Sequence, residues 1–114
     1  MAFPERIETG VTPLDIFKVA RLDFEEPDFK RFPCLRLAYQ ALSTGGSAPA
    51  ILNAANEVAV ESFLKCHMSF TSIPRMIEEV IQTVGHKDIA TLSDVLAADR
   101  AAREAAYEWL ACLA

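Results

Sequence analysis

The chain has 114 residues, a formal net charge of −5 and 52% hydrophobic residues. This length and hydrophobicity predict a single folded domain with one modest core, and they exclude a disordered chain. Its four glycines, Gly10, Gly45, Gly46 and Gly85, cannot form a G-x-G-x-x-G or G-x-x-x-x-G-K-[ST] loop. A nucleotide-binding domain built on either phosphate-binding loop is therefore not expected within this sequence.

The charge distribution argues against two classes of partner. Eleven Lys and Arg residues are outnumbered by sixteen Asp and Glu residues, and the basic residues do not cluster along the sequence. We therefore expect binding neither to nucleic acid nor to a membrane surface, because both need concentrated positive charge. No apolar run approaches the ~20 residues that span a bilayer, and no secretion signal is visible. The widely spaced cysteines Cys34, Cys66 and Cys112 predict reduced, buried thiols in a cytoplasmic protein.

Residues 1–32 are predicted to form an extended arm. Prolines at positions 4, 13 and 27, with Pro33 directly after them, interrupt any helical period in this region. Apolar and polar residues partly alternate over residues 16–24, most clearly over 20–24, which is a weak signal for one β-strand. Such a strand has no partner in this sequence, so it would pair with a sheet supplied by another domain.

Residues 33–114 are predicted to form an all-α domain, an antiparallel four-helix bundle. Each helix carries an apolar stripe at helical spacing, and the connections between helices are short. The residues predicted to begin or cap the four helices are Pro33, Ser47, Ser72 and Ser93. Gly45-Gly46 and Gly85 are predicted to end the first and third helices.

The most unusual string is Asn53-Ala54-Ala55-Asn56-Glu57 in the second predicted helix. Asn53, Asn56 and Glu57 stand at i, i+3 and i+4, so they share one helix face. Asparagine is unfavourable inside helices, which indicates that these side chains have a role. One interpretation is contact with a ligand or substrate. The interpretation that we favour is structural: the three side chains hold irregular backbone of the arm by satisfying its polar groups.

Other polar groups give weaker signals. Cys66 and His67 are adjacent but fit no zinc-binding spacing. The acidic run over residues 23–28 contains a proline and is interpreted as a solvated loop rather than a magnesium site. Asp99 and Arg103 are four residues apart, so they can pair on the fourth helix. Because no nucleophile, base or metal cluster emerges, we predict no catalytic, cofactor-binding or metal-binding residue, and a small independent enzyme is disfavoured.

Several strings occur together in one order along the chain. They are Pro13-Leu14-Asp15, Glu26-Pro27-Asp28, Arg31-Phe32-Pro33-Cys34-Leu35, Asn53-Ala54-Ala55-Asn56-Glu57, Phe63-Leu64, Phe70, Ile73 and the segment from Asp99 to Arg103. Over nearly the whole chain they resemble the C-terminal portion of the 1-deoxy-D-xylulose 5-phosphate reductoisomerase family. The resemblance implies that residues 1–32 are the final strand-and-linker stretch of the family's central catalytic domain and that residues 33–114 are its C-terminal helical domain. Such a fragment is expected to be inactive without the remaining domains of the enzyme.

That family implies an NADPH-dependent enzyme that uses Mg²⁺, Mn²⁺ or Co²⁺ and forms homodimers. It makes 2-C-methyl-D-erythritol 4-phosphate in non-mevalonate isoprenoid biosynthesis. Its cofactor, metal and substrate sites precede the portion that this chain resembles, so no site residue is carried over. The alternative is a free-standing helical interaction module, which would dock another protein by adding residues 11–24 to the edge of its sheet.

Overall fold

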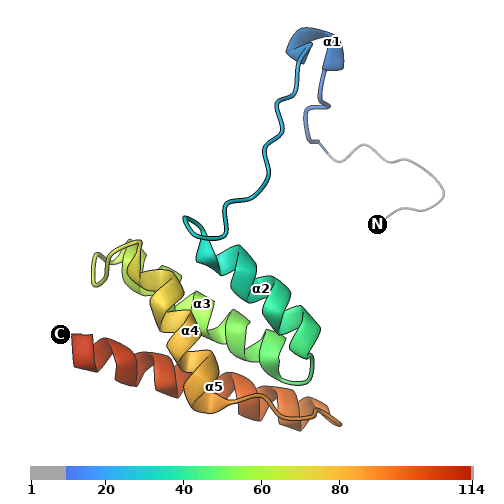
Figure 1. Ribbon diagram of the computed structural model, residues 1–114. Helices are drawn as coiled ribbons and strands as arrows, with labels where there is room; N and C mark the ends of the chain where they lie inside the picture. The colour runs from blue at the N-terminus through green and yellow to red at the C-terminus, as the bar shows by residue number, and fades with distance from the viewer. Residues whose placement is uncertain (1–9, 114) are drawn as a thin grey trace.

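The computed structural model describes residues 10–113 and contains α-helices and no β-strand in that range (Figure 1). The five helices are α1 (Ile16–Val19), α2 (Pro33–Thr44), α3 (Ala48–Leu64), α4 (Ser72–Val84) and α5 (Leu92–Leu113). The last four pack together as a helical bundle, so the all-α prediction is confirmed. Among the described helices, none is both long enough and apolar enough to cross a membrane.

The segment before α2 extends away from the bundle (Figure 1), and every residue from 10 to 32 is exposed. Near its end, Phe29 contacts Tyr39 of α2, with ring centroids 6.2 Å apart. The candidate β-strand is not formed within this chain, because Ile16–Val19 makes the single helical turn α1 and residues 20–27 have no strand partner. Asp15 explains this turn, since its carboxylate accepts the backbone N–H groups of Phe17 and Lys18 at 3.1 and 3.3 Å. Residues 1–9 of the predicted arm lie outside the described residues.

Proline and glycine set the helix boundaries as predicted. Pro33 is the first residue of α2 and Pro49 the second of α3, where a missing N–H group costs no intrahelical hydrogen bond. Gly45 ends α2 and Gly85 ends α4, with φ angles of 71° and 67°. Gly46 is restricted further, because a Cβ there would lie 2.5 Å from the carbonyl oxygen of Lys87. This turn therefore packs directly on the connection between α4 and α5.

Of the three predicted serine caps, Ser47 is the N-cap residue of α3 but does not cap it through its side chain, and the caps at Ser72 and Ser93 are wrong. The hydroxyl of Ser47 accepts the backbone N–H of Lys87 at 2.8 Å, and the Ser47 N–H donates to the Lys87 carbonyl at 2.9 Å. Ser72 is already the first residue of α4, and its hydroxyl pairs with that of Ser69 at 2.7 Å. Ser93 lies inside α5, which begins one residue earlier. The hydroxyls of Ser47 and Ser72 are thus used in tertiary and local contacts instead.

Helix α5 begins instead with a reciprocal pair of hydrogen bonds between Thr91 and Asp94. The hydroxyl of Thr91 accepts the Asp94 N–H at 3.3 Å, and the Asp94 carboxylate accepts the Thr91 N–H at 3.1 Å. Residues three apart that cap each other in this way form a capping box. The capping hydroxyl of α5 is therefore that of Thr91 and not that of the predicted Ser93.

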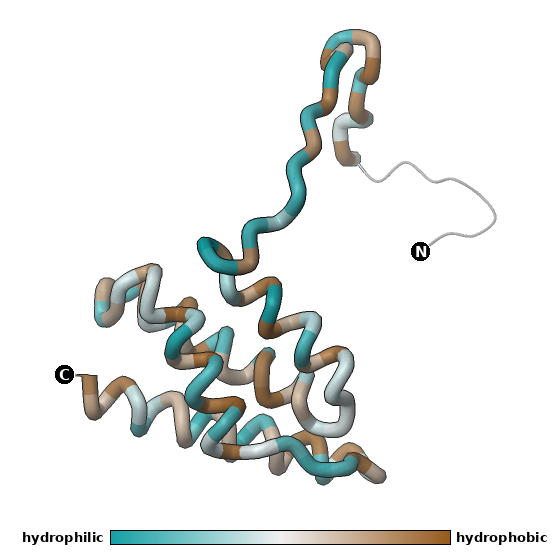
Figure 2. Tube along the Cα trace, viewed as in Figure 1, coloured by the Kyte–Doolittle hydropathy of each residue, from teal (hydrophilic) through white to brown (hydrophobic). Residues whose placement is uncertain are grey.

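Helix α3 is the centre of the bundle and contacts the other three helices. Figure 2 shows apolar residues recurring along the bundle helices. Alanines let α5 approach closely, since Ala102 and Ala106 are fully buried. The prediction of buried cysteines is wrong for Cys66 and Cys112, which are exposed near the ends of helices. Cys34 is half-buried, and this burial raises the pKa of its thiol.

Candidate functional site

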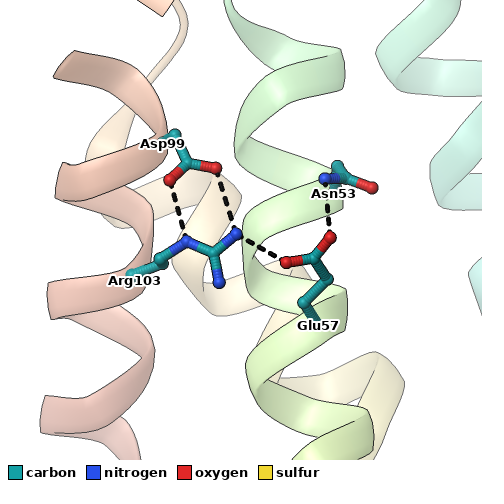
Figure 3. Close-up of polar contacts among 4 residues, drawn as sticks. All are labelled: Asn53, Glu57, Asp99 and Arg103. Carbon is teal, nitrogen blue, oxygen red and sulfur yellow. Dashed lines mark hydrogen bonds and ion pairs between the residues drawn. The ribbon is translucent and has the colours of Figure 1, made fainter. Parts of the chain in front are cut away.

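A four-residue polar network joins α3 to α5 (Figure 3). Arg103 donates to Asp99, one turn earlier on α5, through Nε to Oδ2 at 2.8 Å and Nη2 to Oδ1 at 3.3 Å. The same Nη2 donates across to Oε2 of Glu57 on α3 at 2.6 Å. Asn53 completes the network by donating to Oε1 of Glu57 at 3.4 Å. One guanidinium thus serves two carboxylates on two helices.

The network is ionic and only partly shielded from water. The side chains of Arg103, Asp99 and Glu57 are 35%, 32% and 54% exposed. The hydrogen bond from Arg103 lowers the pKa of Glu57, and the hydrogen bonds to Asp99 and Glu57 raise the pKa of Arg103. Glu57 and Arg103 therefore stay charged at neutral pH. Such a pair is suited to holding two helices in register rather than to exchanging protons with a substrate.

The three residues predicted to be structural do not all face the same neighbours. Asn53 and Glu57 bond to each other, and Glu57 bonds to α5 instead of to the backbone of the arm. Asn56 instead borders a groove beside the start of α2. All three side chains belong to exposed residues. Their structural role therefore stays a prediction, with α5 as the partner that is observed for Glu57.

The other candidate groups remain separate. Within residues 10–113, no three or more His, Cys, Asp and Glu side chains are placed to hold a metal ion. Cys66 and His67 are exposed beyond the end of α3. The acidic run over residues 23–28 is exposed as well, and Asp23 pairs with Arg21 at 3.2 Å. These groups offer no assembled site for a cofactor.

Sequence reasoning found half of the network. The Asp99–Arg103 pair was predicted from its four-residue spacing and is confirmed. The contact between Arg103 and Glu57 was missed because the two residues are 46 positions apart. The only available signal was chemical: Glu57 is an acid on a polar helix face, and Arg103 has more donors than Asp99 can use.

Comparison with known proteins identifies the family. The family described as the DXP reductoisomerase C-terminal domain matches residues 1–105. The 1-deoxy-D-xylulose 5-phosphate reductoisomerase of Nitrosospira multiformis is 80% identical over 114 residues, which are 100% of this chain and 29% of that relative. That of Pseudomonas aeruginosa strain PAO1 is 59% identical over 110 residues, covering 96% of this chain and 28% of the relative.

Solved structures agree with these sequence matches. The reductoisomerase from Zymomonas mobilis in complex with NADPH is 39% identical and has a TM-score of 0.84, covering 96% of this chain and 29% of that one. A DOX-P reductoisomerase in complex with NADPH, fosmidomycin and magnesium is 35% identical, with a TM-score of 0.83, covering 98% of this chain and 30% of that one.

The chain therefore spans less than a third of the length of these relatives and corresponds to their C-terminal portion. These matches confirm the resemblance seen in the sequence, and they favour it over a free-standing interaction module. The chain belongs to the DXP reductoisomerase C-terminal domain family.

Proposed function

We propose that this chain is the C-terminal structural domain of a reductoisomerase and is not catalytic by itself. The whole enzyme would convert 1-deoxy-D-xylulose 5-phosphate into 2-C-methyl-D-erythritol 4-phosphate, with NADPH and Mg²⁺, Mn²⁺ or Co²⁺, in non-mevalonate isoprenoid biosynthesis. The observation that carries the proposal is the match to the C-terminal domain family over residues 1–105, in a chain that covers 29% of the Nitrosospira relative.

In this proposal, residues 1–32 are an extended arm and linker at the end of the catalytic domain, and residues 33–114 are the C-terminal four-helix bundle domain. Asn53, Asn56 and Glu57 are structural residues of that domain. NADPH and the metal would bind to the remaining domains, as the resemblance to the family implies. Those domains are the partners of this chain, the full-length enzyme is a cytoplasmic homodimer, and neither nucleic acid nor a membrane is involved.

An exchange of domains between relatives tests this function. In the chimera, the present chain replaces the 114 matched residues of the Nitrosospira multiformis reductoisomerase, which are 80% identical to it. We expect the chimera to oxidise NADPH in the presence of 1-deoxy-D-xylulose 5-phosphate and magnesium at a rate comparable to that of the natural relative. The present chain alone is expected to show no turnover in the same assay.

Two controls accompany the activity comparison between the chimera and the free chain. The Nitrosospira multiformis relative without its 114 matched residues shows whether its catalytic part requires this domain for activity. Circular dichroism and NADPH binding show whether the chimera is folded. Turnover by the 114-residue chain alone would contradict the proposal, as would a folded, NADPH-binding chimera with no activity.

A further inference from the structure

A groove of about 370 Å³ lies between α4 and the C-terminal half of α5, two helices that pack together (Figure 1). Its apolar lining comes from Ala105, Trp109, Cys112 and Leu113. Trp109 is half-buried and packs against the core, so only part of its side chain is available in the groove. Cys112 and Leu113 are both exposed. The groove therefore presents one aromatic ring and smaller apolar groups to the solvent.

The groove between α4 and α5 is negatively charged. Glu79 of α4 and Glu108 of α5 line it, and among the described residues its lining includes no lysine, arginine or histidine. Both glutamates are exposed, and neither takes part in an ion pair found among residues 10–113. The last turn of α5 contains no basic residue, although cations are favoured at the negative end of a helix dipole. The described part of the chain therefore leaves this negative charge without a partner.

The combination of carboxylates with an indole ring selects the chemistry of an occupant. Carboxylates attract lysine and arginine side chains, and an indole is the best aromatic partner for either cation. The stems of lysine and arginine are apolar, so they can pack along Cys112 and Leu113 while their charge reaches Glu79 or Glu108. The groove thus fits a basic segment better than an acidic or a purely apolar one.

The position of the groove in the sequence indicates where such a segment comes from. The family match ends at residue 105, before Glu108, Trp109 and Cys112. A contact on which the whole family depends would be expected within the matched residues. The Nitrosospira relative still matches over all 114 residues, so this end of the chain is shared with a near relative. The groove therefore favours a partner outside the architecture that the family has in common.

We propose that the groove between α4 and α5 binds a basic segment of a second protein, one that is not part of the reductoisomerase. A lysine or arginine of that segment contacts the Trp109 ring and the carboxylate of Glu79 or Glu108. Two observations select this occupant: the unpaired negative charge of the groove and its place beyond the family match. The proposal does not depend on the proposed function, because the surface is present in the chain by itself.

The fluorescence of Trp109 tests binding at the groove directly, because Trp109 is the single tryptophan of the chain. The probe is a short synthetic peptide in which lysine and arginine alternate with leucine. A peptide with glutamate in place of every basic residue is the matched control. We expect the basic peptide to change the Trp109 emission in a saturable manner, and added salt to weaken this binding by screening the charges. The acidic peptide should leave the emission unchanged.

Two double variants with equal changes of net charge locate the binding site. Glu79→Gln with Glu108→Gln removes both carboxylates of the groove, whereas Glu26→Gln with Glu104→Gln removes two exposed carboxylates that do not line it. We expect the first pair to weaken binding of the basic peptide at least about tenfold, and the second pair less than about twofold. Glutamine and glutamate are similar helix formers, so circular dichroism should show the same helical content in both variants.

Alkylation of Cys112 distinguishes other occupants of the groove from a second protein. Cys112 lines the groove and is exposed in the chain. We expect iodoacetamide to modify it at similar rates in the free chain and in the chimera, as mass spectrometry of its peptide would measure. Slower modification in the chimera would overturn the proposal, because the remaining domains would then cover the groove. Slower modification in a free chain that sediments as a dimer would overturn it in favour of a second copy.

The binding experiments have equally clear outcomes. A Trp109 emission that does not respond to the basic peptide would overturn the proposal, as would equal effects of the two double variants. Saturable binding that the groove variant alone weakens, together with an accessible Cys112 in the chimera, would support it. A chimera without turnover would contradict the proposed function and leave these binding results standing.

Discussion

At the level of single residues, Arg103 bonds to carboxylates on two helices at once, which a lysine could not do with the same geometry. Its planar guanidinium contacts Asp99 through two nitrogens and keeps an N–H for Glu57 on the neighbouring helix. A lysine ammonium is a point charge on a flexible stem and cannot hold this fork-like geometry. We therefore interpret the network as the feature that fixes the relative orientation of α3 and α5.

The lowered pKa of Glu57 makes part of the stability depend on pH. A carboxyl group whose pKa is lower in the folded state stabilises the fold fully above its unfolded pKa of about 4.3, and this contribution disappears as the pH falls through the folded pKa. We expect the free energy of unfolding to decrease below about pH 5. Glu57→Gln should make this decrease shallower, as measured by urea unfolding from pH 7 to pH 3.

A double-mutant cycle provides the control for this prediction. Arg103→Met removes the largest cause of the shift, so it should flatten the profile as Glu57→Gln does, and the effect of the double variant should be smaller than the sum of the two single effects. Some acid sensitivity should remain in every variant, because the pKa values of Glu61 and Asp94 are also lowered, by Lys65 and by backbone N–H groups. Additive effects of the two substitutions would contradict the interpretation.

At the level of elements, two residues near the start of α5, Thr91 and Ser93, could cap this helix from the sequence alone. The structure gives this role to Thr91 and not to Ser93. We expect Thr91→Ala to lower the free energy of unfolding by about 1 kcal/mol, as the loss of a helix cap does. Ser93→Ala, at an exposed position inside the helix, should change it by less than about 0.5 kcal/mol. Thermal and urea unfolding of the two variants would show the reverse order if Ser93 were the cap.

The elements also show what sequence can predict. Pro33, the Gly45-Gly46 pair and Gly85 act through their own backbone restrictions, so the helix boundaries that they set were predictable. Side-chain caps and turns were not predictable in this way, because a serine hydroxyl can bond to several different groups. The Ser47 hydroxyl, for example, accepts from a residue 40 positions away. The same reason explains α1: Asp15 stabilises a local turn, whereas the predicted strand had no partner within the chain.

At the scale of the whole molecule, the chain consists of a packed bundle and an exposed arm, whose Phe29 contacts Tyr39 of α2 close to the bundle. Every residue from Gly10 to Phe32 is exposed, including Phe17 at 95% and Phe24 at 87%. In the free chain we expect the amides of residues 10–27 to exchange at nearly the rate of an unfolded peptide, while those of α3 are strongly protected. Equal protection of the arm in a chain verified as a monomer would contradict this expectation.

The contact between Ser47 and Lys87 has a consequence for the order of folding. Its two hydrogen bonds join positions 40 residues apart, so they close a long loop whose entropic cost must be met by other contacts. Those contacts are the packing of α3 and α4, which lie inside the loop. The turn at Gly46 therefore reaches its final shape only once both helices are in place. Protection of the amide protons of Ser47 and Lys87 from exchange is therefore expected to report on the packing of α3 against α4.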